Sequence, residues 1–361
     1  MRRRSFLAGS AALLVTSAKA AIPPAEMVQI TPDLIAAAQK EGRVLVRYSS
    51  PVDEMTGMAR AFEKRFGIQV QMDRKVGVVA TQLFATEERA GQHVMDVNFG
   101  SDPPGLLDLA DEGLYLRYTL PDIAQKIDAS CIISELGYAP RWTDVVVAYN
   151  PSVLPHARAK QLLATWSGLL DPALSGKIGL TEPAGGGVAF VTYLMFYRLA
   201  QYGRAFLQKL AKQEPRLYPG SAQGREDLAS GAISVFLPDW ESAELAEVLK
   251  GSKIAWWYPE ILPGFANTFL SVSARAPHPA AARLFCAWFF TPEGAPALEA
   301  AQSRPTLKGI ADTRSGLEVV NKTDWWQPFP EARRWKPSQE DWNTHYAELM
   351  PDMRTVLGWT G

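Results

Sequence analysis

The sequence is poor in cysteine and histidine, with two cysteines and four histidines in 361 residues. Zinc sites need clustered Cys and His ligands, and the histidines here are far apart in the sequence, with none in an H-x-x-x-H or Cys/His spacing. A disulfide framework also needs more cysteines than two. A single disulfide between Cys131 and Cys286 stays open, because a sequence does not give the distance between them.

Catalytic motifs are missing as well. The sequence contains no G-x-S-x-G elbow, since residues 220–224 (GSAQG) have the wrong spacing, and no phosphate-binding loop with a Gly-Lys-Ser/Thr ending. Paired acids such as Glu87-Glu88 and Asp111-Glu112 are typical of solvated helix faces. We therefore expect no enzyme and assign no catalytic residue, no metal and no cofactor. An exported hydrolase is the competing class.

An excess of positive charge is also absent. The whole chain has 37 basic and 38 acidic residues, for a net charge of −1. A mildly acidic chain with dispersed charges is a poor candidate for nucleic-acid binding, and it has no basic stripe for an anionic membrane surface. We expect neither as a partner.

Long apolar runs are absent too, and the only short one with a targeting pattern lies at the start. Residues 2–7 (RRRSFL) precede a weakly apolar run of about ten residues, shorter than the roughly 20 that span a bilayer. The run ends at Ala18-Lys19-Ala20, a small-x-small cleavage signal. We expect residues 1–20 to be an export signal that resembles the twin-arginine type, with an ordinary Sec signal as the alternative. The predicted location is the periplasm.

The remaining chain alternates strand and helix patterns, which predicts α/β units with mostly parallel sheets covered on both faces. A chain of this length usually forms two domains. The predicted strands are 43–48, 68–72, 95–99, 177–180, 233–237 and 254–258. The predicted helices are 33–40, 53–65, 78–91, 103–111, 188–202, 206–213, 221–230 and 241–249.

One strand-to-helix turn is rich in glycine. The strand 177–180 leads through Glu182-Pro183 into Ala184-Gly185-Gly186-Gly187 and an apolar helix. Glycines at a helix start let a ligand approach the unpaired N–H groups of the first turn. The turn does not match a dinucleotide-binding motif, because Phe190 stands where the third glycine belongs. A plain turn without a ligand remains the alternative.

Several segments resemble the periplasmic substrate-binding proteins of ABC transporters, in the extracellular solute-binding family that includes ferric-ion binders. The most specific segments are 166–172 (WSGLLDP) with 176–180 (GKIGL), 231–235 (GAISV), 277–282 (PHPAAA) and 291–294 (TPEG). The resemblance implies a two-lobed periplasmic-binding-protein fold of the class II type with two crossing strands at the hinge. It also implies a small-molecule solute in the cleft and a membrane permease as partner. We expect a monomer.

Two extended runs are predicted to cross between the lobes, residues 142–149 and 267–273. They assign residues 21–141 and 267–361 to lobe 1 and residues 142–266 to lobe 2. The last 37 residues hold five of the eleven tryptophans, which predicts a tail clamped onto its lobe by aromatic side chains.

The candidate ligand-binding residues follow from this arrangement, because ligands of open α/β sheets bind beyond the carboxyl ends of the strands. They are Ser49, Ser50, Ser101, Asp102, Trp142, Gly185, Gly186, Gly187, Asp239, Trp240 and Arg304. Several of them have structural alternatives: Ser49, Ser101 and Asp239 as helix caps, Trp142 as hinge core, and Arg304 as a surface residue.

The sequence departs from the ferric-ion binders at one point. Those proteins place two adjacent tyrosines near the end of the strand that corresponds to 233–237, where this chain has Pro238-Asp239-Trp240-Glu241. Fe(III) prefers phenolate and carboxylate oxygens, whereas an aspartate beside a tryptophan suits an organic cation or hydroxyl group. The glycine-rich helix start at 185–187 would then take a carboxylate or phosphate at the other end of the ligand. We therefore expect a small organic anionic or zwitterionic solute, with ferric iron as the alternative.

Overall fold

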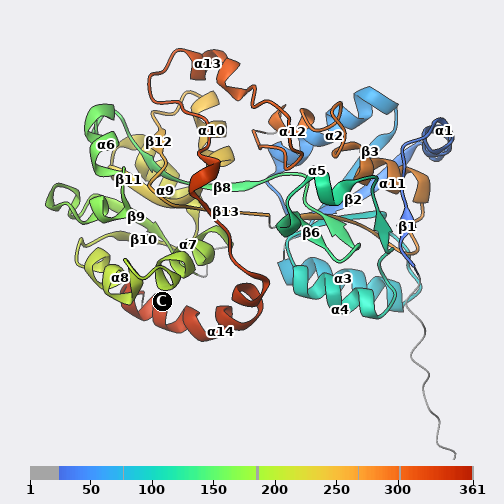
Figure 1. Cartoon of the computed structure of the whole chain (residues 1–361), viewed down its shortest axis with the longest axis horizontal. Helices are drawn as coiled ribbons and strands as arrows, with labels where there is room; N and C mark the ends of the chain where they lie inside the picture. Colours follow the sequence, from blue (N-terminus) through green and yellow to red (C-terminus); the bar gives the residue numbers. More distant parts are fainter. Residues whose placement is uncertain (1–23, 76, 184–186, 267, 301, 360–361) are drawn as a thin grey trace, which may run out of the picture.

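The structure is a computed structural model that describes residues 24–359 except 76, 184–186, 267 and 301. It consists of two lobes that lie side by side, each built around its own β-sheet (Figure 1). The two-lobed α/β fold of the sequence analysis is confirmed.

The first lobe contains a six-stranded sheet in the order β3-β2-β4-β14-β7-β6. Its strands are β3 (Gln69–Arg74), β2 (Arg43–Tyr48), β4 (Val97–Gly100), β14 (Phe269–Val272), β7 (Gly137–Tyr138) and β6 (Ile132–Ile133). The first three are parallel, and β14 pairs antiparallel with β4 and β7.

The helices of this lobe are α1 (Pro32–Glu41), α2 (Val52–Phe66), α3 (Gly77–Arg89), α4 (Pro103–Asp111), α5 (Ile123–Lys126), α11 (Pro279–Trp288) and α12 (Ala297–Ala300), with the short strands β1 (Glu26–Met27) and β5 (Tyr118–Thr119) paired outside the main sheet. The first four helices begin and end within a few positions of the predicted bounds, whereas α5, α11 and α12 were not given bounds from the sequence. In α1 the cause is visible: Thr31 Oγ1 accepts the Leu34 N–H at 3.1 Å, and Gly42 ends the helix at a φ of 73°.

The second lobe contains a seven-stranded sheet in the order β10-β9-β11-β8-β13-β15, with β12 also paired to β8. Its strands are β10 (Arg216–Tyr218), β9 (Ile178–Thr181), β11 (Val235–Trp240), β8 (Thr143–Tyr149), β13 (Leu262–Phe265), β15 (Arg334–Trp335) and β12 (Ala255–Trp257). The sheet is parallel over β10, β9 and β11, and antiparallel where β8 enters. Its helices are α6 (His156–Leu162), α7 (Gly187–Arg198), α8 (Gly203–Ala211), α9 (Ser221–Ser230), α10 (Glu241–Leu249), α13 (Glu318–Asn321) and α14 (Gln339–Val356).

Each lobe has a separate hydrophobic core, and the cores show where the chain passes from one lobe to the other. The first core ends at Ala139 and resumes at Ala266, whereas the second includes Val145 and continues to Phe265. The strands that follow these two passages, β8 and β14, become central strands of the two sheets. The two runs predicted to cross between lobes are therefore strands of one sheet each, with the passages at their N-terminal ends.

The C-terminal segment corrects the lobe assignment made from the sequence. We placed residues 267–361 in the first lobe, but the segment from Val320 onwards packs on the second core, through Trp325, Phe329, Met353 and Leu357. The aromatic clamp is present on that lobe: the ring of Trp256 lies 4.5 Å from Trp325 and 5.5 Å from Trp326. The chain thus passes between the lobes a third time, after α12, because its apolar partners lie on the other side.

Cys131 and Cys286 are both free and buried in the first core. The disulfide that the sequence left open is therefore not formed. Burial raises the pKa of both thiols, which keeps them protonated and unreactive.

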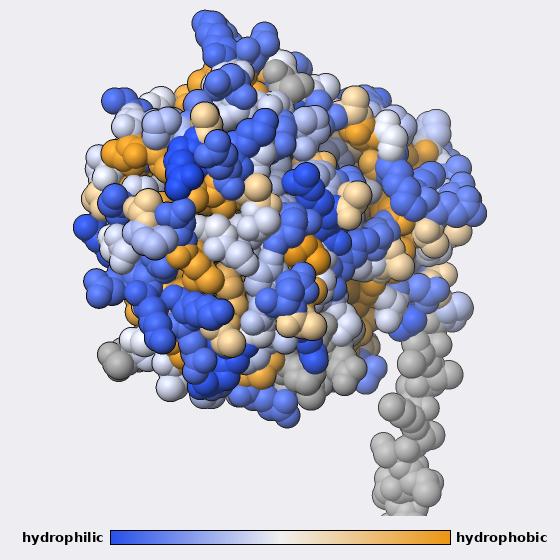
Figure 2. Space-filling model, turned by 60° about the vertical axis from the view of Figure 1, so that its left-hand side comes forward, coloured by the Kyte–Doolittle hydropathy of each residue, from blue (hydrophilic) through white to orange (hydrophobic). Residues whose placement is uncertain are grey.

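In the part of the chain that the structure describes, no helix has the length and apolar character required to cross a membrane. The surface in Figure 2 is mostly polar, with apolar residues in small separate patches.

The tryptophan clamp makes a prediction about stability. Trp256→Ala should lower the free energy of unfolding by about 3–5 kcal/mol, because a buried tryptophan leaves a large cavity and the C-terminal segment loses its ring partner. Trp257→Ala, on the same strand but half-buried beside Lys160, should cost much less. Urea unfolding of both variants checks this, and equal losses would contradict the clamp.

Candidate ligand-binding cleft

A cavity of about 680 Å³ lies between the lobes, a size that suits a small organic molecule. One side belongs to the first lobe, and the other includes the start of α7 and the end of β13. The C-terminal segment after β15 completes it. The lining residues are Val78, Ser101, Asp102, Pro103, Pro104, Ala129, Ser130, Ile132, Ile133, Gly187, Phe265, Ala266, Phe269, Lys336, Pro337 and Ser338.

Ser101 and Asp102 lie in this cavity as the sequence analysis expected, because they follow the carboxyl end of β4. Asp102 also caps α4: its carboxylate accepts the Gly105 N–H at 3.2 Å and the Thr81 hydroxyl at 2.6 Å. Asp102, rather than Ser101, is therefore the N-cap of α4, and its cap position is what holds it at the cavity wall.

Of the three glycines predicted at the helix mouth, Gly185 and Gly186 lie outside the described residues. Gly187 is the first residue of α7 and lines the cavity. It places the N-terminal end of a twelve-residue helix at the second-lobe side of the cleft. The positive end of the helix dipole favours negative charge at this position.

A second, smaller cavity of about 130 Å³ also lies between the lobes. It contains Trp240 from the second lobe, half-buried, opposite Pro51, Asp53 and Glu54 at the start of α2.

Ser49 and Ser50, which precede α2, line neither cavity. The Ser49 N–H donates to the carbonyl of Phe99 at 3.1 Å, and Ser50 is buried, with its hydroxyl accepting from Arg141 at 3.1 Å. Ser49 thus extends the pairing of β2 with β4 inside the first lobe, whereas Ser50 contacts Arg141 at the passage between the lobes.

Asp239 is fully buried, which does not fit the ligand contact that the sequence analysis expected. One carboxylate oxygen accepts from the Arg225 guanidinium at 2.6 Å and the other accepts the Trp240 N–H at 2.8 Å. The neighbouring Glu244 is buried as well, and its burial and the negative charge of Asp239 raise the pKa of the Glu244 carboxyl. Asp239 is thus a structural ion-pair partner beneath the cleft.

The guanidinium of Arg304 is also paired with carboxylates of the protein itself and does not point at a bound anion. Its guanidinium donates to Asp144 and Glu331, each at 2.6 Å, and lies 4.4 Å from the ring of Phe329. The side chain is 12% exposed. The expected anion-binding role does not fit these contacts, because its donors already face two carboxylates.

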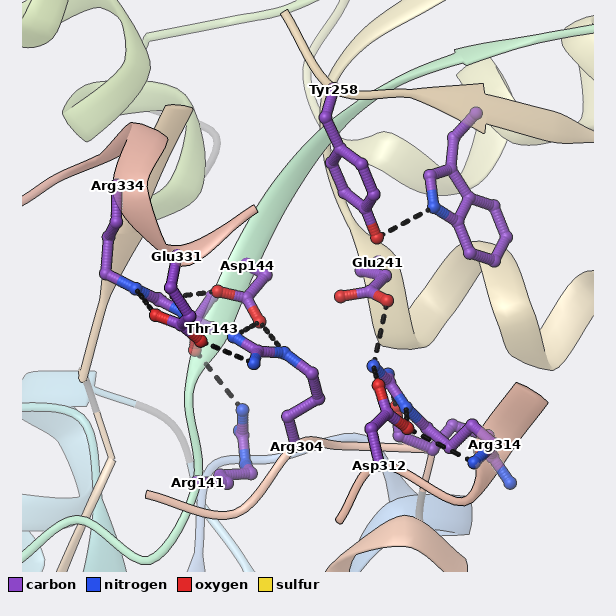
Figure 3. A network of polar contacts seen from close by, with 12 residues as sticks. Arg141, Thr143, Asp144, Glu241, Tyr258, Arg304, Asp312, Arg314, Glu331 and Arg334 are labelled. Atoms are coloured by element: carbon purple, nitrogen blue, oxygen red, sulfur yellow. Dashed lines mark hydrogen bonds and ion pairs between the residues drawn. The ribbon is translucent and has the colours of Figure 1, made fainter. Parts of the chain in front are cut away.

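Arg304 belongs to a buried network at the passage between the lobes (Figure 3). Its centre is Asp144 on β8, whose two oxygens accept from Arg304 and Arg334, both at 2.6 Å. Burial by itself would raise the pKa of Asp144, but the two guanidinium groups outweigh it and lower that pKa.

Three further ion pairs extend the network. Arg314 bonds Glu241, the first residue of α10, at 3.0 Å and Asp312 at 2.7 Å. On the first-lobe side Arg141 pairs with the buried Glu54 and donates to Thr268 at 3.1 Å. Glu54 also lines the smaller cavity, so the network lies directly against the cleft.

Trp142 stands at the edge of the network. It is half-buried, with the guanidinium of Arg334 at 4.1 Å from its ring and the ammonium of Lys336 at 5.5 Å. The hinge-core alternative describes its contacts here, although its ring touches a lysine that lines the larger cavity.

Most of the apolar residues that line the larger cavity, and its lysine, are not among the residues predicted from the sequence. Phe269 lies in the run predicted to cross between lobes, so the signal for it existed. Ile132 and Ile133 come from a two-residue strand, and Lys336 comes from the tail that we had placed elsewhere. No local pattern marks these residues.

Among the residues that the structure describes, no group of three or more His, Cys, Asp or Glu side chains is placed to hold a metal ion.

Two lobes with a cavity between them define a binding protein of the two-lobed periplasmic type. The sequence agrees: residues 57–328 match the model of the bacterial extracellular solute-binding proteins. The chain belongs to this family. No match is found among curated proteins.

Solved structures with the same fold include a substrate-binding protein of an ABC transporter from Agrobacterium tumefaciens, at 15% identity and a TM-score of 0.67 over 87% of this chain and 94% of that one. Iron-bound HitA from Pseudomonas aeruginosa has 18% identity and a TM-score of 0.61, covering 88% and 98%. AfuA from Actinobacillus pleuropneumoniae with bound fructose-6-phosphate has 20% identity and a TM-score of 0.55, covering 75% and 86%.

The Asp144 network predicts a strong and pH-dependent effect on stability. Asp144→Asn should cost about 3–5 kcal/mol, because it removes the buried carboxylate that two buried arginines share and leaves only the more exposed Glu331 opposite them. Since the pKa of Asp144 is lower in the folded state than in the unfolded one, the wild-type advantage is complete above about pH 4 and declines as the pH falls further.

Asp324→Asn is the matched control, because that aspartate is 80% exposed and should change stability little. Urea unfolding between neutral and acidic pH measures both variants. A wild-type advantage over Asp144→Asn that stays constant down to pH 2 would contradict the pKa direction.

Proposed function

We propose that this chain is the periplasmic solute-binding component of an ABC importer, and that it captures a small organic anionic or zwitterionic solute between its lobes. The observation that carries the proposal is the cavity of about 680 Å³, which both lobes and the C-terminal segment line. A cavity between two lobes can close around a solute by hinge motion. The solute would then be handed to a membrane permease, a separate chain.

The family supports the binding role, since its members are extracellular solute-binding proteins. The neighbours with the same fold carry different cargo, iron in one and fructose-6-phosphate in another, so the fold itself does not select the solute. The export signal proposed for residues 1–20 agrees with a periplasmic location. The mature chain would begin at or near Ala21.

Ferric iron is less well supported than an organic solute. A ferric site without the tyrosine pair would need phenolates from other tyrosines. Two candidates in the second lobe are Tyr149 and Tyr193. Their hydroxyls are already engaged, with His156 Nδ1 at 2.6 Å and with the Thr181 carbonyl at 2.8 Å. Burial also raises the pKa of both phenols, which opposes the phenolate that Fe(III) prefers.

The identity of the cargo is directly testable. Protein purified from the periplasm and denatured should release an organic anion or zwitterion that mass spectrometry identifies, and adding it back should raise the melting temperature. Protein that instead takes up one Fe(III) per chain and turns orange-red would favour the iron alternative.

A blocking variant tests the location. Ser101→Trp should fill the half-buried cleft position and abolish the ligand-induced rise in melting temperature, while the unliganded protein still melts near the wild-type temperature. Ser175→Trp, at an exposed position of the second lobe, is the matched control and should keep the full rise. Loss of the rise in both variants would exclude a specific effect at the cleft.

A further inference from the structure

Four apolar side chains from three strands line the larger cavity. Ile132 and Ile133 come from β6, Phe269 from β14 and Phe265 from β13. Ile133 and Phe269 belong to the first core and Phe265 to the second. The apolar surface therefore bridges the two lobes at the passage between them.

Further apolar residues line the same cavity. Pro103 and Pro104 start α4, Pro337 follows β15, and Val78 near the start of α3 is 58% exposed. Valine at this exposure leaves apolar area in contact with water, and covering it is favourable in proportion to the area removed. A solute with many hydroxyl groups would instead place polar atoms against side chains that offer them no hydrogen bonds.

The charged groups of this cavity are Asp102 and Lys336. Both oxygens of Asp102 already accept hydrogen bonds, from Thr81 and from the Gly105 N–H. Lys336 pairs with Asp128, whose carboxylate also accepts from Ser130. Although burial raises the pKa of Asp128, its bonds to Lys336 and Ser130 lower it to about 2, so this carboxylate stays ionised and holds the ammonium at the cavity.

An ammonium group has three N–H donors, so Lys336 can bond a second carboxylate beside Asp128. The C-terminal segment that carries it runs between the lobes from the crossing strands to α14 (Figure 1). Lys336 lines the same cavity as these apolar side chains and supplies its positive charge.

We propose that the solute is a carboxylate with an aromatic or branched aliphatic body, which lies on the side formed by Ile132, Phe265 and Phe269 while its carboxylate bonds Lys336. This inference rests on the proposed binding function and narrows the solute to one chemical class.

The experiment compares carboxylates of equal charge and different bodies on the mature protein, by calorimetry and thermal shift. The apolar probes are 3-phenylpropionate and 4-methylpentanoate, and the hydrophilic probes are glycerate and gluconate. The apolar probes should bind at least tenfold more tightly than the hydrophilic ones.

Two variants test the apolar contact and the carboxylate contact separately. Ile132→Ser should lower the affinity for 3-phenylpropionate about three- to tenfold, since it removes apolar contact area. The affinity for glycerate should stay unchanged. Lys336→Gln should lower the affinity for every carboxylate probe about ten- to a hundredfold, which is the usual effect of losing a hydrogen bond to a charged group. Matched controls are Val153→Ser and Lys322→Gln, both exposed positions of the second lobe, which should change neither affinity.

The outcomes distinguish this inference from the function on which it rests. Tight binding of a hydrophilic acid, a sugar phosphate or an inorganic anion, with no binding of the apolar probes, would overturn the apolar-carboxylate inference and leave the solute-binding function intact. Binding of 3-phenylpropionate that Ile132→Ser and Lys336→Gln do not weaken would overturn the placement in this cavity. Release of no solute from periplasmic protein, together with uptake of one Fe(III) per chain, would overturn both proposals.

Discussion

The arrangement of the cleft depends on one buried carboxylate, Asp144 on β8. It accepts a guanidinium on each oxygen, and the two arginines come from separate parts of the C-terminal third, Arg304 and Arg334. A buried charge without a partner is costly, so these segments are held where the charges are matched. Because Arg334 is fixed, β15 stays beside β13, and Lys336, Pro337 and Ser338 reach the cavity. A single ion-pair centre thus positions one side of the binding site.

The sequence predicts the regular elements well because their signals are local. The helices 103–111, 221–230 and 241–249 were predicted at the bounds that the structure has for α4, α9 and α10. Strand ends in the parallel part of a sheet meet at one edge, and the cavity is lined by Ser101 and Asp102, as this topological rule predicts. The rule needs only the order of strands and helices, which hydrophobic patterns reveal. It does not tell which side chains at that edge face the cleft, and Ser49 and Ser50 do not line it.

The errors all concern partners that are distant in the sequence. Asp239 was expected to face the ligand, but Arg225 on a neighbouring helix neutralises it beneath the surface. Arg304 pairs with Asp144, which is 160 positions away in the sequence. The residues around Arg304 give no signal that this carboxylate is its partner. The tail was assigned to the wrong lobe for the same reason, because Trp325 and Trp326 find their ring partner, Trp256, on a strand of the other lobe. Charge and aromatic residues were visible in the sequence, whereas their partners were not.

The division of the two cores along the chain has a consequence for how the protein is made. The first core lacks its central strand until β14 has been synthesised, and the second includes Met350, Met353 and Leu357 near the very end. The first lobe can therefore complete its core only after the chain as far as Leu298 has emerged, and the second only after Leu357 has emerged, although domains that are continuous in sequence can fold as they emerge. During synthesis the second lobe thus exposes apolar surface for longer than the first.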